Sequence, residues 1–195
     1  RCLRGTRRTV TVGKDVMPIP PFVVELREKI GHAPLWLPGS SAIVLRRMDA
    51  PNASIDGAAP EALEVLLVLR SDNGNWAPIT GIVDPGEHPA EAARREAMEE
   101  AQVEIKVERL TLLSVTEQVT HVNGDQAQYL DLTFRCRWLS GEGAVGDDES
   151  TRVEWYPVTD LPPMREDLAY RIRSAVAGGP ECELLEGRQI RTASA

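Results

Sequence analysis

The sequence predicts an α/β fold in which a mixed β-sheet lies between helices. Short apolar runs typical of strands occur both before and after one central helical segment, and a second helical pattern closes the chain. No internal repeat is visible. Strands on both sides of a helix in the chain favour a sheet that helices cover on two faces. A length of 195 residues suits one domain with a full hydrophobic core.

The first predicted elements are a helix and a pair of strands. Phe22, Leu26 and Ile30 recur at helical spacing after a proline-rich start, which predicts a helix. Apolar runs at 42–45 and 64–70 predict two strands. A segment rich in Pro, Ala, Gly and Asn separates them and indicates a surface loop, so we expect the two strands to pair.

The second half of the chain predicts a hairpin, a short strand and a closing helix. Apolar patterns at 110–121 and 126–139 flank Asn123-Gly124, which favours a tight turn and therefore a long antiparallel ribbon. A short strand at 153–158 follows. The closing helix starts near Arg165, and its apolar stripe consists of Leu168, Ile172 and Val176.

Composition and charge exclude several classes of protein. The residues are 42% apolar and 27% charged, and no run of about 18 apolar residues could span a bilayer. A net charge of −8 argues against nucleic-acid binding through a broad basic surface. Cys2, Cys136 and Cys182 show neither metal-site nor disulfide spacing, which favours a cytoplasmic location.

The domain is expected to cover residues 17–178. Residues 1–16 are rich in Arg and lack a long apolar stretch, so they indicate a basic N-terminal extension or a vector-derived tail, not a secretory signal. Residues 179–195 form a C-terminal tail whose lack of pattern is compatible with disorder.

Between these two groups of predicted elements lies the segment GIVDPGEHPAEAARREAMEEAQV, residues 81–103, which carries six carboxylates. Pro89 suits the first turn of a helix, which predicts a helix over 89–102. Its alanines form a stripe that permits close approach to a sheet: Ala90, Ala93, Ala97 and Ala101. Glu96, Glu99 and Glu100 fall on the neighbouring arc. Two interpretations stay open, a solvated acidic face and an oxygen-ligand site for an ion such as Mg²⁺.

Two loops flank this helix. The loop before it contains Glu87, and Arg95 is spaced to reach back and pair with that carboxylate in a bidentate contact. The loop SGEGAVGDDES at 140–150 is either a flexible acidic turn or a second source of carboxylates for the same site.

The acidic segment resembles the Nudix box, the pattern G-x5-E-x7-R-E-U-x-E-E-x-G-U in which U is aliphatic. Every charged position is in register, from Gly81 through Glu87 and Arg95-Glu96 to Val103. One position departs clearly from the pattern, because Gln102 stands where the family has glycine, and Ala97 in the aliphatic place is a milder departure. If that residue is left-handed, glutamine costs about 1 kcal/mol in helix termination while activity survives. The resemblance implies a Nudix-type α/β/α sandwich.

The resemblance also implies site residues and a cofactor, Mg²⁺ or Mn²⁺. Glu99 and Glu100 take the places of the principal metal ligands, with the Gly81 carbonyl as a partner. Glu96 is a ligand or the catalytic base. Arg95 and Glu87 brace the loop against the helix.

Some Nudix enzymes carry their base outside the box, in a loop before a late strand. The loop at 140–150 has that place in this sequence. Glu149 is therefore the first candidate for the base, and Asp148 is the second.

The implied activity is hydrolysis of a phosphoanhydride bond in a nucleoside diphosphate-linked or nucleoside triphosphate substrate. Alternatives are a hydrolase of a non-nucleotide diphosphate and a ligand sensor without turnover, although sensors often lose box glutamates that are all present here. The partner is expected to be a small molecule, without nucleic acid or membrane. A homodimer could form through the N-terminal helix or the long hairpin.

Outside the box, several residues are candidates for substrate contacts. His121 and the arginines at strand ends could face phosphates, or they could be solvated surface charges. The candidates for stacking on a base, although isolated aromatic residues in strands are more often core residues, are Trp36, Trp76, Tyr129, Phe134, Trp138, Trp155 and Tyr156. The arginines are Arg46, Arg47 and Arg70.

Overall fold

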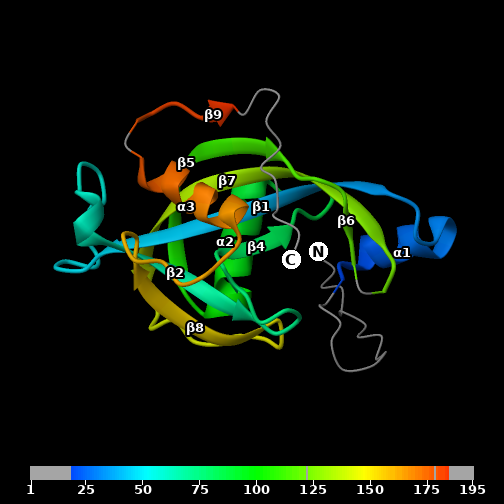
Figure 1. Ribbon diagram of the computed structural model, residues 1–195, viewed down its shortest axis with the longest axis horizontal. Coiled ribbons are helices and arrows are strands. Elements are labelled where there is room, and N and C mark those ends of the chain that lie inside the picture. Colours follow the sequence, from blue (N-terminus) through cyan, green and yellow to red (C-terminus); the bar gives the residue numbers. More distant parts are fainter. Residues whose placement is uncertain (1–18, 122, 178, 185–195) are drawn as a thin grey trace, which may run out of the picture.

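A mixed β-sheet runs through the centre of the computed structural model, which describes residues 19–121, 123–177 and 179–184 (Figure 1). The helices are α1 (Pro21–Ile30), α2 (Pro89–Ala101) and α3 (Glu166–Val176), with a 3-10 turn η1 (Pro60–Ala62). The strands are β1 (Leu35–Arg47), β2 (Leu63–Arg70), β3 (Trp76–Ala77), β4 (Ile79–Ile82), β5 (Glu104–Val115), β6 (Val119–Thr120), β7 (Gln126–Ser140), β8 (Ser150–Pro157) and β9 (Glu183–Leu184).

The sheet is organised around the parallel pair β1 and β7. Its main path has the order β3-β2-β1-β7-β5-β9, while β4 pairs with β1, β6 with β7 and β8 with β2. Both predicted strand pairings are present, because β1 pairs antiparallel with β2 and β5 pairs antiparallel with β7. β4 pairs with residues 39–42 of β1, and β2 pairs with residues 45–47 of the same strand. This register sets Gly81 of β4 opposite Ser40 of β1.

Helix α2 packs on one face of the sheet through the predicted alanine stripe. Ala93, Ala97 and Ala101 are fully buried and contact apolar side chains such as Val44 and Leu66. Small side chains at these positions let the helix lie close to the strands. The same closeness brings the carboxylates of the neighbouring arc to the edge of the sheet.

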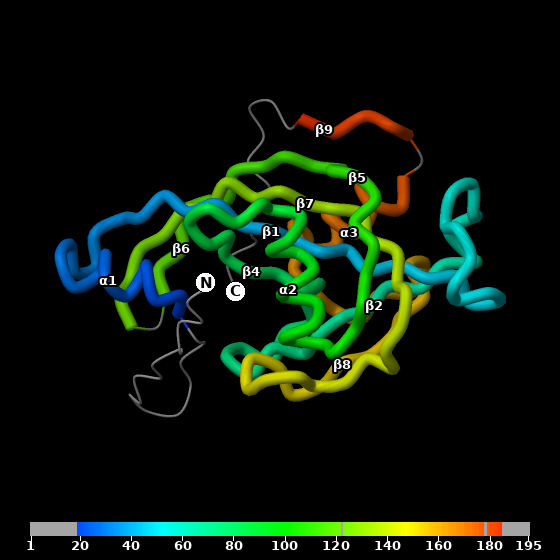
Figure 2. The backbone as a smooth tube through the Cα atoms, turned by 180° about the vertical axis from the view of Figure 1, so that it is seen from behind, coloured from blue at the N-terminus to red at the C-terminus, as the bar shows by residue number. Residues whose placement is uncertain are grey.

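Helix α3 covers the opposite face, so the predicted sandwich is confirmed (Figures 1 and 2). Ile172 packs on Ile43 and Leu45 of β1 in a second core cluster. Alternation along β1 explains the two cores, because successive strand residues point to opposite faces. Arg171 of α3 is also buried and forms an ion pair of 2.7 Å with Asp131 of β7.

Two details at the ends of the described chain go beyond what the sequence predicted. The face of α1 that carries Leu26 and Ile30 is exposed, and Val23 is the buried residue of this helix. Val23 packs against Leu37 and Ala127, near the start of the two central strands β1 and β7. Part of the expected C-terminal tail is ordered, because β9 pairs with β5. The predicted extension at 1–16 and the rest of the tail lie outside the described residues.

No helix in the described part of the chain is long and apolar enough to cross a membrane.

Candidate active site

Strand β4 and helix α2 meet at Gly81. A Cβ atom built on Gly81 would lie 2.1 Å from the carboxyl carbon of Glu96, too close unless the glutamate shifts. A side chain at position 81 would therefore force the Glu96 carboxylate to move away from β4. Ser40, on the adjacent strand, donates a hydrogen bond of 3.0 Å to the carbonyl of Pro89 and fixes the start of α2.

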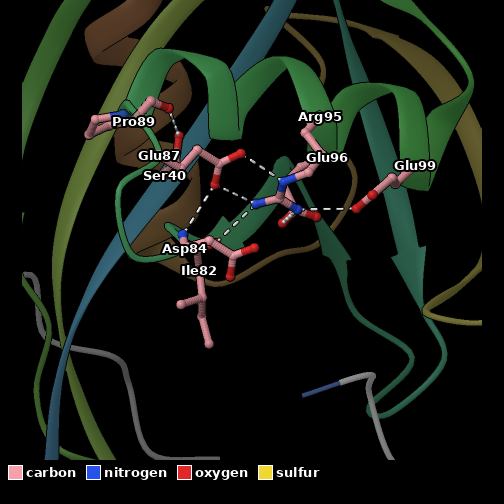
Figure 3. Close-up of polar contacts among 8 residues, drawn as sticks. All are labelled: Ser40, Ile82, Asp84, Glu87, Pro89, Arg95, Glu96 and Glu99. Atoms are coloured by element: carbon pink, nitrogen blue, oxygen red, sulfur yellow. Dashed lines mark hydrogen bonds and ion pairs between the residues drawn. The ribbon is translucent and has the colours of Figure 1, made fainter. Parts of the chain in front are cut away.

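Arg95 braces the loop before α2, as the spacing predicted (Figure 3). Its Nε and Nη2 atoms donate to the two carboxylate oxygens of Glu87 over 2.9 and 3.0 Å. Nη2 also donates to the carbonyl of Ile82, and the amide of Asp84 donates to Glu87. The Arg95 hydrogen bond holds the pKa of Glu87 below its ordinary value.

The third nitrogen of the Arg95 side chain faces the next two carboxylates of the helix. Nη1 lies 2.5 Å from Glu96 Oε1 and 3.1 Å from Glu99 Oε2 (Figure 3). Glu96 is 9% exposed. One guanidinium thus gathers three of the four box glutamates on one side of the helix.

Glu100 is the most buried carboxylate of the box. It is 4% exposed, and its Oε1 atom is buried without a hydrogen-bond partner among the described residues. Burial raises the pKa of Glu100 well above its ordinary value, and the negative charges of Glu149 and Glu96 raise it further. Arg70 opposes this effect. A buried, unpaired acceptor among like charges is costly unless a proton or a cation joins it.

The loop at 140–150 packs on the C-terminal turn of α2 and extends the acidic site. The amide of Gly146 donates to the carbonyl of Glu100 over 3.0 Å. Burial, followed by the charges of Asp147 and Glu96, raises the pKa of Glu149 to about 7. Of the two predicted base candidates, Asp148 is exposed and Glu149 is partly buried.

The structure adds Asp147 to the site, a residue that we did not single out from the sequence. Its charge contributes to the raised pKa of both Glu100 and Glu149. Its position in the same acidic loop was visible, but which of several loop carboxylates faces the box depends on how the loop folds.

The residues present fit a hard divalent cation. They supply only oxygen donors, they carry excess negative charge, and one buried carboxylate oxygen lacks a partner. In the described residues, no three His, Cys, Asp or Glu side chains already converge as a finished metal centre. Glu96 and Glu99 are instead paired with Arg95.

The other candidate residues separate into those near the site and those elsewhere. Arg70 pairs with Asp72 over 2.7 Å and interacts electrostatically with Glu100 and Glu149. His121 is exposed and lies 3.2 Å from the hydroxyl of Tyr129.

The remaining candidates have structural partners of their own. Arg46 lies over the ring of Trp155 at 3.8 Å and pairs with Glu64, while Arg47 pairs with Asp49. Among the other aromatic residues, Phe134 is buried in the core and Trp36 is 55% exposed. Trp76 and Tyr156 contact each other edge to face, and Trp138 contacts Trp155 in the same way.

Comparisons with known proteins agree with the fold and identify the family. The family model of the NUDIX domain matches residues 52–177. A MutT-like protein from Streptomyces ambofaciens is 30% identical over 128 residues, which cover 65% of this chain and 77% of that protein. A human 8-oxo-dGDP phosphatase is 31% identical over 161 residues, which cover 80% of this chain and 42% of that protein. The chain therefore spans about two fifths of the length of the human relative.

Among solved structures, the NUDIX domain of NrtR from Shewanella oneidensis, complexed with ADP ribose, has a TM-score of 0.51. It is 19% identical, and the match covers 79% of this chain and 94% of that one. At this level of identity the likeness supports the fold alone.

Proposed function

The chain belongs to the Nudix family of hydrolases, and we propose that it hydrolyses a phosphoanhydride bond in a small nucleotide with the help of a divalent cation. The observation that carries this proposal is the buried group of carboxylates at the end of α2. Glu100, with an unpartnered oxygen, lies within electrostatic range of Glu96 and Glu149. Such a cluster lowers the stability of the protein when no cation is bound, so its arrangement favours a role in cation binding.

In this proposal, Glu96, Glu99 and Glu100 hold Mg²⁺ or Mn²⁺, with the Gly81 carbonyl as a further ligand. The bound cation would neutralise the diphosphate and lower the pKa of an attacking water. Glu96 and Glu99 would exchange part of their pairing with Arg95 for the cation. Arg95 would keep its bidentate contact with Glu87 and so hold the loop in place.

Glu149 is the proposed general base. A base works best when its pKa lies near the operating pH, and the pKa of about 7 supports this role. Glu96, which shares the site, is the second candidate. Asp148 is less favoured because its side chain is exposed.

The proposed substrate is a nucleoside di- or triphosphate derivative. A human relative is named as a phosphatase of 8-oxo-dGDP, which supports a small nucleotide as the class of substrate. Arg70 interacts electrostatically with Glu100 and Glu149, so we propose that it contacts the substrate phosphates. The acidic net charge of −8 supports a partner other than nucleic acid. A cytoplasmic location and a homodimer stay predictions.

The test is a hydrolysis screen with dNTPs, 8-oxo-dGDP, ADP-ribose, nucleotide sugars, NADH and diadenosine polyphosphates. Each reaction is run with Mg²⁺, with Mn²⁺ and with EDTA, and added phosphatase reveals products that release no free phosphate. We expect turnover of one substrate class that EDTA abolishes. Turnover that survives EDTA would refute the metal role, and binding of nucleotide without any turnover would favour the sensor.

A further inference from the structure

The residue that departs from the Nudix pattern has an unusual backbone conformation. Gln102, the C-cap of α2, has φ 53° and ψ 40°, in the left-handed region. In the described part of the chain it is the one residue other than glycine with positive φ. Glycine adopts this conformation more readily, so glutamine at this position costs about 1 kcal/mol that glycine would not.

The side chain of Gln102 makes a contact that glycine could not make. Its Nε2 atom donates a hydrogen bond of 3.2 Å to the carbonyl of Val145. Val145 lies in the middle of the 141–149 segment, which we call the acidic loop. The contact therefore joins the end of the box helix to the loop that precedes β8.

The acidic loop rests on the last turn of α2 through its backbone as well. The amides of Ala144 and Gly146 donate to the carbonyls of Ala101 and Glu100, each over 3.0 Å. These carbonyls belong to the last turn of the helix, where no intrahelical donor is available. A Cβ atom on Gly146 would lie 1.9 Å from the carbonyl oxygen of Glu99, so loop and helix are in close contact.

Both ends of the acidic loop are fixed to other elements. At its start, Trp138 Nε1 donates to the carbonyl of Gly141 over 2.8 Å. At its end, the hydroxyl of Ser71 donates to the carbonyl of Glu149 over 2.9 Å. Gln102 supplies the side-chain contact between α2 and the middle of the loop, immediately ahead of Asp147.

We propose that Gln102 is a positioning residue that clamps the acidic loop onto α2 and thereby holds Glu149 beside the box carboxylates. The inference rests on the proposed function, in which Glu149 is the base. The strained backbone conformation of Gln102 is offset by the contact with the loop.

Two variants separate the side-chain contact from the backbone conformation. Gln102→Gly removes both the hydrogen bond and the strain, whereas Gln102→Met keeps the length and the strain but removes the donor. Hydrogen exchange reports on the loop through the Ala144 and Gly146 amides, and kinetics report kcat and KM separately on the best substrate of the screen. Glu149→Gln measures how much turnover depends on the base.

We expect both Gln102 variants to lose amide protection by about two- to tenfold, the effect of one modest hydrogen bond. kcat should fall by a similar factor, with KM changed by less than about twofold, because the loop positions the base and not the substrate. The melting temperature of Gln102→Gly should equal or exceed that of the wild type, since glycine relieves the strain. A merely structural role would lower stability and activity together.

Unchanged protection in both variants would overturn the clamp. Lost protection with wild-type kcat would overturn the positioning role, provided that Glu149→Gln is inactive. An active Glu149→Gln would overturn the positioning role as well, because Glu149 would then not be the base. If the wild type turns over no substrate, the proposed function fails, while the exchange rates still decide whether Gln102 holds the loop.

Discussion

Replacing Glu149 with glutamine should stabilise the metal-free protein, and the gain should depend on pH. The folded state raises the pKa of this carboxyl from 4.5 to about 7. Below the unfolded pKa the carboxyl is protonated in both states and does not lower the free energy of unfolding. As pH rises through the folded pKa, the carboxylate becomes charged in its crowded site and the folded state loses stability. At pH 8 the shift corresponds to about 3 kcal/mol, or about 2 kcal/mol after allowance for solvent screening.

The assay is urea unfolding in EDTA at pH 8.0 and pH 5.8, both above the isoelectric point near 5.0. We expect Glu149→Gln to raise the free energy of unfolding by about 2 kcal/mol at pH 8.0 and by about half as much at pH 5.8. Glu142→Gln, at an exposed position in the same loop, is the matched control and should change little at either pH. A gain that is equal at both pH values, or a loss at pH 8.0, would refute the reasoning about the crowded carboxylates.

Three further predictions follow from the same geometry. Arg95→Lys loses the bidentate contact with Glu87, so kcat should fall about tenfold and stability by about 1–2 kcal/mol; wild-type kinetics would show that the brace is dispensable. Gly81→Ala places a methyl group on Glu96, so a loss of about 1–3 kcal/mol in urea unfolding is expected, and an unchanged midpoint would contradict the close contact. Mg²⁺ should raise the melting temperature more at pH 8.0 than at pH 5.8, since protons compete for the carboxylates; a larger effect at the lower pH would oppose this account.

Local patterns predicted the central elements well. The alanine stripe of α2, with Ala97 at its centre, follows directly from helical periodicity, and the pairing of Arg95 with Glu87 follows from their spacing. Asn123-Gly124 indicated the hairpin between β6 and β7, and the structure has Gly124 in a positive-φ conformation there. Each of these features depends on residues that are near one another in the chain.

Features that depend on distant segments were not predictable. The sequence contains no local signal that Val145 meets Gln102, or that Asp147 lies beside the box, because both contacts arise when the acidic loop folds onto α2. The glycine at 146 was a hint of a close approach, without a partner to identify. Arg46 was equally compatible with phosphate binding until the fold placed Trp155 beneath it.

The burial of helix α1 also depends on segments that are distant in the sequence. Its apolar spacing correctly predicted a helix, yet the face with Leu26 and Ile30 remains exposed. Periodicity predicts that a face is apolar, whereas burial depends on what the rest of the chain supplies to cover it. Here the start of β1 and β7 covers the side of the helix that carries Val23, and leaves Leu26 and Ile30 exposed.

The most direct test of the central claim is Mn²⁺ binding followed by electron paramagnetic resonance, on the wild type and on Glu100→Gln. The account predicts that the wild type binds Mn²⁺ and that the variant, while still folded by circular dichroism, binds it at least about tenfold more weakly and has lost turnover. Equal affinity in the two proteins, with turnover retained in the variant, would contradict the claim that the buried carboxylates of α2 are the metal site.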